Sequence, residues 1–337
     1  MAHMVETMAY AGEVPWHGLG VKVEDGLGVD EMIKEAGLDW KVRKIPATAE
    51  FDGQRIYSGH DMLVRESDGQ PLDMVKENWV PVQNSEAFEF FREFCDAGDM
   101  EMHTAGSLQD GKRVWALAKV KDDFTINGGD KVDSYLLLTN PHMYGRAVDI
   151  RFTPIRVVCN NTLTLSLANK GDYQIALNHK KAFDPQEAKE LLGVAKGKME
   201  TYKDMAQFLS SKRYTPETLR TYFSTVFANQ NPKVKGIGFD PANTEDFLKY
   251  GSKNAKLAME VVGTQPGAHY GEGSFWQAFN AVTYLTDHQL GRENDSRLNS
   301  AWYGVNKVKK TKALELSLIH ISEPTRPERI GFAGVWV

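Results

Sequence analysis

Two patterns of apolar and polar positions divide the chain near residue 160. Before that point, short segments alternate between apolar and polar residues, as is typical of half-buried strands. Six such segments occur, at 56–65, 72–82, 100–105, 113–120, 134–139 and 146–158. The first two are joined by a turn that contains Asp68-Gly69, a dipeptide that favours a tight hairpin. The short connections predict antiparallel pairing of these strands.

Helical spacing occurs twice in the first half and dominates the second. Residues 29–36, with Asp30 as the cap, and residues 85–97 predict two helices within the strand-rich half. Asp184-Pro185 and Thr215-Pro216 are typical helix starts, because proline is tolerated at the first helical position. Helices are therefore predicted over 184–209 and 215–227, from 244 and over 274–290, one or two more over 300–316, and a loop over 229–243. The order predicts an α+β fold, with a sheet-rich region over 1–160 and a helical region over 161–315.

The last predicted strand carries the most informative polar pattern. Apolar residues alternate regularly up to Phe152, and beyond Pro154 the apolar positions shift by one residue. A β-bulge at Thr153-Pro154 would explain the shift, because proline cannot donate to a strand ladder. The bulge would place four polar residues on one face opposite the core, namely Asp149, Arg151, Arg156 and Asn160. Such a row suits an anion or a nucleic-acid backbone, and the alternative is an ion-pair network on a solvated face.

Composition limits the class of protein. The 337 residues are 42% hydrophobic and include seven tryptophans, which excludes an intrinsically disordered chain. Cys95 and Cys159 are too few for a disulfide scaffold and favour a reducing compartment. No apolar stretch is long enough for a membrane span, and no signal peptide is visible, so we expect a cytoplasmic protein without a membrane partner.

Charge is unevenly distributed. Residues 1–150 contain 15 Lys and Arg against 27 Asp and Glu, a balance of −12, and residues 151–337 contain 25 against 18, a balance of +7. The basic half also combines cations with aromatic residues, as single-strand binding requires. The cations concerned are Lys212, Arg213, Lys307, Lys309 and Lys310, close in sequence to Tyr214, Trp302 and Tyr303. The alternative is that helices simply expose more lysine than strands do.

Other reactive groups give weaker signals. Cys159 would need a nearby histidine to act as a nucleophile, and its predicted phase favours a buried structural role. Trp16-His17 suits a lid or a base-stacking element, or a loop that packs its tryptophan on the sheet. Asp287-His288 lacks the partners of a metal site, and Gly236-Ile237-Gly238 lacks the rest of a nucleotide-binding fingerprint. We therefore predict no catalytic residue, metal or cofactor.

Several motifs carry a family resemblance. They are Val14 to Gly20, reading Val-Pro-Trp-His-Gly-Leu-Gly, then Thr104 to Leu108, Val114 to Ala118, Thr153 to Leu163, Asn280 to Thr283, and Lys310 to Leu314. With them the chain, up to about Leu314, resembles the phage/plasmid-like protein family, which is built on a domain of unknown function. The resemblance implies phages, prophages or plasmids in a bacterial host cell, near genes of DNA metabolism. The order of sheet and helices is also similar, by analogy, to that of phage single-strand annealing recombinases.

The end of the chain has a different character. From Leu316 it reads Leu-Ser-Leu-Ile-His-Ile-Ser-Glu-Pro-Thr-Arg, which resembles the translation of a sequencing adapter. We therefore expect residues 316–337 to be a non-native tail.

Three functional hypotheses follow from the sequence. The first is a non-enzymatic protein of DNA metabolism that binds single-stranded nucleic acid and anneals or protects it. Its phosphate contacts would be Arg151, Arg156 and Asn160, extended by Lys212, Arg213, Lys307, Lys309 and Lys310. The second is an enzyme acting on nucleic acid or nucleotides, with Asp149, His17 or His288 as acid or base. The third is a structural or host-interaction protein, and a homo-oligomer is compatible with each of the three.

Overall fold

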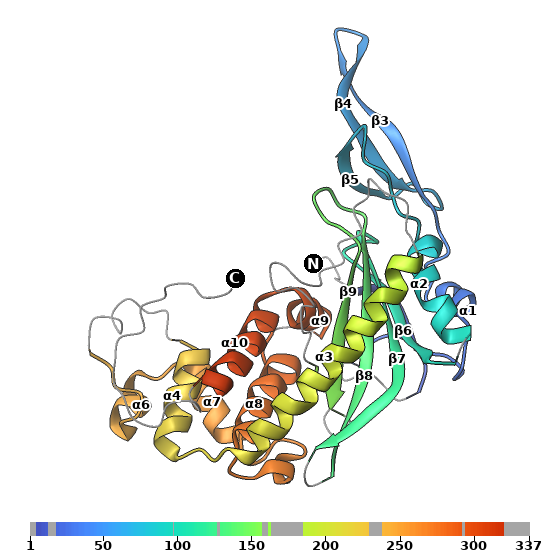
Figure 1. Cartoon of the computed structure of the whole chain (residues 1–337). Coiled ribbons are helices and arrows are strands. Elements are labelled where there is room, and N and C mark those ends of the chain that lie inside the picture. Colours follow the sequence, from blue (N-terminus) through green and yellow to red (C-terminus); the bar gives the residue numbers. More distant parts are fainter. Residues whose placement is uncertain are drawn as a thin grey trace.

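The protein has a central sheet with helices on both faces, a helical bundle at one end and a projecting β-hairpin at the other (Figure 1). The computed structural model describes residues 5–12, 18–96, 98–126, 129–156, 161–162, 185–228, 238–291 and 294–319. Strand-rich and helical segments follow one another along the chain as predicted, and the α+β fold class is confirmed.

Over the described ranges the large sheet has seven strands, in the order β10-β9-β8-β7-β6-β1-β2. Their bounds are β1 Val5–Tyr10, β2 Val21–Lys22, β6 Met100–Leu108, β7 Arg113–Ile126, β8 Asp130–Pro141, β9 Asp149–Arg156 and β10 Asn161–Thr162. All neighbours pair antiparallel except β1 and β2, which are parallel. The four strands β6 to β9 form a continuous meander, because each follows its neighbour across a short turn.

A second sheet of three strands makes the projection. It contains β3 Val42–Phe51, β4 Gln54–Arg65 and β5 Pro71–Lys76, in that order. The predicted hairpin at 66–71 joins β4 to β5, whereas β3 and β1 were not predicted. The outer part, residues 48–60, is exposed on both sides, and we call it the arm. Its turn places Asp52 at φ 50° and Gly53 at φ 74°, the left-handed conformations that a tight hairpin requires.

Three helices cover one face of the large sheet, which we call the inner face. They are α1 Val29–Glu35, α2 Asn84–Asp96 and α3 Pro185–Ser211. Phe88, Phe91, Leu136 and Phe152 belong to the core between these layers. The cap of α1 differs from the prediction, because Gly28 precedes the helix and its N–H donates to Glu31 at 2.9 Å.

The bundle contains the remaining helices. They are α4 Pro216–Val226, α6 Thr244–Tyr250, α7 Lys253–Val261, a 3-10 turn η1 Ala268–Gly271, α8 Phe275–Tyr284, a π-helical turn η2 Leu285–Gln289, α9 Asn294–Tyr303 and α10 Val305–Ile319. The helix predicted from 244 is divided at Gly251. Of the one or two helices predicted over 300–316, the structure has two, the end of α9 and α10, which are separated at Gly304. Helix α10 continues beyond Leu316, and its Ser317 is buried and hydrogen-bonded to Ala313.

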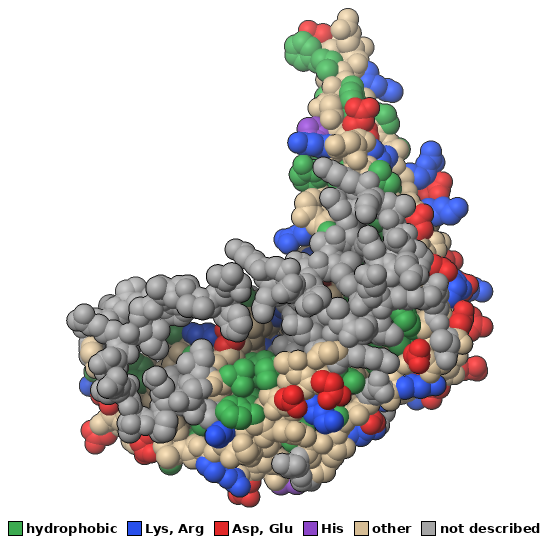
Figure 2. Space-filling model, viewed as in Figure 1, with side chains coloured by type: hydrophobic (Ala, Val, Ile, Leu, Met, Phe, Trp, Pro, Cys, Tyr) green, Lys and Arg blue, Asp and Glu red, His purple; other side chains and the backbone are tan. Residues whose placement is uncertain are grey.

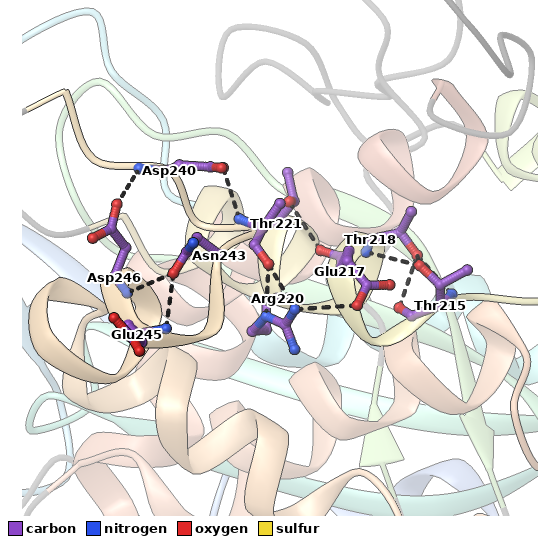
Figure 3. Close-up of polar contacts among 10 residues, drawn as sticks. Thr215, Glu217, Thr218, Arg220, Thr221, Asp240, Asn243, Glu245 and Asp246 are labelled. Atoms are coloured by element: carbon purple, nitrogen blue, oxygen red, sulfur yellow. Dashed lines mark hydrogen bonds and ion pairs between the residues drawn. The ribbon is translucent and has the colours of Figure 1, made fainter.

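Polar contacts connect α4 to the turn before α6 (Figure 3). The guanidinium of Arg220 donates to the carbonyl of Ala242, at 2.6 Å from Nη2, and to Glu217. Asn243 caps α6 by accepting from the N–H of Glu245 at 2.9 Å, and Thr215 caps α4. These bonds satisfy helix-end groups and fix the turn, so Arg220 has a structural role.

Among the described helices, none combines the length and the apolar character that crossing a bilayer requires.

Candidate anion-binding site

The site is built on β9, whose register differs from the prediction. The pairing of β9 with β8 is unbroken from Asp149 opposite Thr139 to Arg156 opposite Val132. The predicted bulge at Thr153-Pro154 is therefore wrong. A proline fits there because the described part of β10 pairs only with Ile155 and Arg156, so that β9 has one partner strand at Pro154.

The unbroken register rearranges the predicted row of polar residues. Asp149, Arg151 and Ile155 occupy one face of β9, and position 156 falls on the opposite face. The side chain of Arg156 and the whole of Asn160 lie outside the described residues. An arginine and an apolar isoleucine therefore share the outer face of the sheet.

Helix α9 explains this mixture, because it covers the outer face. Leu298, Ala301 and Trp302 form a second core with Trp115 and with other apolar residues of the sheet. The rings of Trp115 and Trp302 meet edge to face, with centroids 4.8 Å apart. The outer face is thus a buried interface rather than a solvated surface, and its polar groups require partners.

Arg151 has such partners. It forms an ion pair with Asp149, and its Nε donates to Oδ2 of that carboxylate at 3.0 Å. Its Nη1 donates to the carbonyl of Trp302 at 3.1 Å. The side chains of Arg151 and Asp149 are only 15% and 11% exposed. Arg151 therefore joins β9 to the end of α9, which is a structural role in addition to any binding role.

Arg113 lies on the same face, two strands away on β7. Its Nη1 donates to Asn299 at 3.0 Å, and its guanidinium lies over the ring of Tyr303 at 4.3 Å. No carboxylate of the described residues forms an ion pair with it. Burial lowers the pKa of Arg113 most, Tyr303 and Asp149 act to raise it, and the charges of Arg146 and Arg151 act to lower it. The half-buried charge of Arg113 is thus held near two other cations and the carboxylate of Asp149.

Tyr303 is the centre of this arrangement. The guanidinium of Arg151 also lies over its ring, at 5.3 Å, so two cations contact one aromatic group. Its hydroxyl shares a hydrogen bond with that of Thr139 at 2.8 Å. Burial raises the pKa of Tyr303 to about 12, so the phenol stays neutral near pH 7. Tyr303 consequently holds the guanidiniums in place without cancelling their charge.

Lys307, in the first part of α10, completes the set. Burial lowers the pKa of Lys307 to about 8, the charge of Arg151 acts in the same direction, and the charge of Asp149 opposes both. We call Arg113, Arg146, Arg151 and Lys307 the cationic cluster. Among the described residues it has one nearby carboxylate, Asp149, one oxygen of which is bound by Arg151. Four cations with a single acid favour an anion with several oxygens, because guanidinium groups bind phosphate in bidentate fashion.

The other predicted lysines of α10 lie in different environments. Lys310 is fully buried and forms an ion pair with Asp287, with Nζ 2.8 Å from Oδ1. Burial lowers the pKa of Lys310, and its position removes it from the surface. Lys309 is half-buried above the ring of Phe227, at 5.9 Å, and burial lowers its pKa as well.

The remaining predicted cations do not join the cluster. Lys212 lies over the ring of Phe208 at 4.9 Å, and Arg213 donates to the carbonyl of Glu272. Both lie between the end of α3 and the start of α4. Of the predicted site residues that the structure describes, Lys307 interacts through its charge with Arg151 and with the buried Lys310, and the others lie apart from this group.

Sequence reasoning missed Arg113 and Arg146, and it noted Tyr303 only as an aromatic residue close in sequence to Lys307. A signal for Arg113 exists in the alternation Arg113, Trp115, Leu117 along β7, because a tryptophan and a leucine on the outer face indicate that this face is covered. No local signal connects Tyr303 to its hydrogen-bond partner Thr139, which lies 164 residues earlier in the chain.

The other candidates for chemistry have other roles or are not described. Trp16, His17 and Cys159 lie outside the described residues. The ring of His288 lies against that of Tyr284, with centroids 4.9 Å apart. In the part of the chain that the structure describes, no three His, Cys, Asp or Glu side chains converge as metal ligands.

Comparison with known proteins gives one match. The family model DUF932, described as a domain of unknown function, matches residues 71–302, which is more than half of the chain. The match includes Arg113, Arg151 and Trp302 and ends before Tyr303 and Lys307. No curated protein and no solved structure matches the chain.

Proposed function

Since the chain belongs to the DUF932 family, whose description assigns no activity, we propose a function from the geometry of the site: the protein binds single-stranded DNA, and the cationic cluster contacts its phosphates. The observation that carries the proposal is the guanidinium of Arg113, which is half-buried near Arg146 and Arg151 and forms no ion pair among the described residues, although the charge of Asp149 acts on it. An unneutralised cation in a partly buried site is unfavourable, and a bound phosphate would relieve it.

The distribution of the cations supports a polymer rather than a small anion. Arg113 begins β7, Arg146 lies in the exposed turn before β9, and Lys307 lies on α10. Charges on three separate elements fit successive phosphates of a backbone better than a single ion. The basic balance of residues 151–337, at +7, would add long-range attraction for a polyanion.

The surroundings of the cluster favour single-stranded DNA over duplex DNA. The cluster lies at the junction of a sheet and a helix, and α9, which covers it, is packed on the outer face of the sheet rather than free to enter a major groove. Binding along a strand would allow the protein to protect or anneal DNA in recombination. The resemblance to phage and plasmid proteins suggests the cytoplasm of a bacterial host as its setting. Arg156 and Asn160 remain predicted contacts.

The test is fluorescence anisotropy with a labelled oligonucleotide, titrated at several salt concentrations. Arg113→Gln shortens the side chain modestly and removes its charge, and it should weaken binding by at least about tenfold. The plot of log affinity against log salt should also become shallower by about 0.7 for each phosphate that the variant no longer neutralises. Lys253→Ala is the matched control, because Lys253 is exposed on α7 away from the cluster, and it should leave affinity unchanged.

The same titration separates the alternatives. Duplex DNA and single-stranded RNA of the same length show strand preference, and free phosphate as a competitor shows whether a small anion suffices. No binding at low salt, or equal affinity of Arg113→Gln and the wild type, would overturn the proposal. Annealing is tested separately, by following energy transfer between two complementary labelled strands.

A further inference from the structure

The arm exposes apolar side chains at its free end. Phe51 is 67% exposed and Ile56 is 50% exposed, and the register places both on one face of the hairpin. Figure 2 shows hydrophobic side chains at the end of the projection, beside acidic ones. Glu50 and Asp52 flank Phe51 in the chain, and Arg55 is the single cation of the turn region. The end of the arm is thus apolar and slightly acidic.

Helix α10 exposes a patch of complementary character. Val305 and Val308 are each 66% exposed, whereas valines elsewhere in the bundle, such as Val261 and Val282, are buried. The two lie one turn apart, on the same helical face as Lys309 and Lys312, whose ammonium groups also contact Asn306 and the carbonyl of Thr225 within the bundle. Two exposed apolar residues with neighbouring cations can receive an apolar end with neighbouring acids.

The arm and this patch cannot meet within one molecule. Figure 1 shows the arm extending away from the body at one end of the molecule, whereas α10 lies in the bundle at the other end. The acidic end of the arm belongs to the acidic half of the chain, residues 1–150 with a charge balance of −12. The patch on α10 belongs to the basic half, residues 151–337 with a balance of +7. The same charges disfavour nucleic acid as the occupant of the arm's end, because Glu50 and Asp52 would repel phosphates.

We propose that the end of the arm, with Phe51 and Ile56, docks on Val305 and Val308 of α10 in a second copy of this chain. The contact joins two different surfaces, so it is head-to-tail and repeats from copy to copy into rings or open chains. Its apolar part is small beside the ~1,600 Å² of a standard interface, so association should depend on concentration and weaken with salt. This proposal is independent of the DNA-binding function.

Two variants each remove one side of the contact. Phe51→Ser with Ile56→Ser alters the arm, and Val305→Asp with Val308→Asp alters α10. All four positions are exposed, so folding should be little affected, and circular dichroism and thermal melting verify this. Sedimentation velocity of the wild type over about 1 µM to 1 mM should show growing oligomers. Each variant alone should remain monomeric.

Mixing the two variants gives the sharpest result. The arm variant retains an intact α10 and the α10 variant retains an intact arm, so together they can make one contact and no more. The mixture should therefore stop at a dimer with one copy of each variant. A monomeric wild type, oligomers in either variant alone, or a mixture without dimer would overturn the proposal. A monomeric wild type whose arm variant loses DNA affinity would assign the arm to nucleic acid instead.

Discussion

The outer face of the large sheet and the arm are both built from antiparallel strands, yet they treat polar and apolar residues in opposite ways. Under α9, charged residues are partly buried, and Arg113, Arg151 and Lys307 each interact with a ring, a carbonyl or another charge. On the arm, Phe51 and Ile56 face solvent although they are apolar. One region therefore buries groups that prefer water, and the other exposes groups that avoid it.

The comparison shows where binding energy is available. A buried cation without a carboxylate gains from an anion, and an exposed phenylalanine gains from an apolar partner. Neither the anion nor the apolar partner is needed for stability within one chain. The cluster depends on packing under α9, whereas the arm depends mainly on its own ladder between β3 and β4. Substitutions should therefore affect global stability strongly in the first region and weakly in the second.

The largest effect is expected at Trp302. Trp302→Ala would remove a side chain that is 1% exposed and packs on Trp115, and should lower the free energy of unfolding by about 3–5 kcal/mol. Urea unfolding followed by circular dichroism measures the change. Phe51→Ala on the arm is the matched control and should change stability by less than about 0.5 kcal/mol. Equal losses in the two variants would contradict the distinction between the regions.

The next largest effect is expected at Asp149. Asp149→Asn would leave Arg151 without its only described acid partner, and should lower the free energy of unfolding by about 3 kcal/mol. Substituting the exposed pair member Glu66→Gln, which contacts Arg43 at 3.5 Å, should change it by less than about 1 kcal/mol. From the proposed phosphate site we also expect Asp149→Asn to strengthen DNA binding per folded molecule, because it removes a negative charge that repels phosphate. Unchanged stability would show that solvent, not Asp149, stabilises Arg151.

These two regions also show what the sequence could predict. The hairpin at 66–71 and helix α2 were predictable because a turn dipeptide and a regular apolar spacing are local signals. Strand β3 was not, because the arm is exposed on both faces and shows no alternation to detect. The bulge in β9 was predicted because the outer face was assumed to be solvated. Covered by α9, that face accepts Ile155 beside Arg151 without a change of register.

The site was predictable only in part, because the sequence does not show which surfaces are covered by other elements. Arg151 and Lys307 stood out as cations in the basic half, and the structure places them close enough to interact. Lys310 has the same local character as Lys307 but is buried against Asp287, which lies 23 residues earlier. Charge alone does not distinguish the two lysines, because burial depends on how α10 packs against the π-helical turn.

A smaller, pH-dependent effect is expected at Lys307. Its pKa of about 8 in the folded state lies below its ordinary value of 10.5, so the unfolded chain binds more protons between these two pH values. Stability from this group should therefore rise as pH increases from about 8 to 10.5. Lys307→Met keeps the apolar stem and should stabilise the protein at pH 7, on the order of 1 kcal/mol after screening.

Urea unfolding at pH 7 and at pH 10 measures this difference. The gain in free energy of unfolding of Lys307→Met over the wild type should be largest at pH 7. It should shrink towards pH 10, where Lys307 of the folded wild type is mostly neutral. Lys253→Met on the exposed face of α7 is the control and should show no such trend. An advantage that is the same at both pH values would assign the effect to packing rather than to charge.

The smallest effect is expected at Gly53 in the turn of the arm. Its φ of 74° is in the left-handed region, and no other atom approaches within 4 Å of the position where a Cβ would lie. Gly53→Ala should therefore cost about 1 kcal/mol through backbone conformation alone, without a clash. Because the arm packs on nothing in the described part of its own chain beyond its ladder, the loss should be local. Hydrogen exchange should speed up for amides of residues 48–60 and stay unchanged in β6 to β8, whereas a uniform increase would mean that the arm unfolds together with the body.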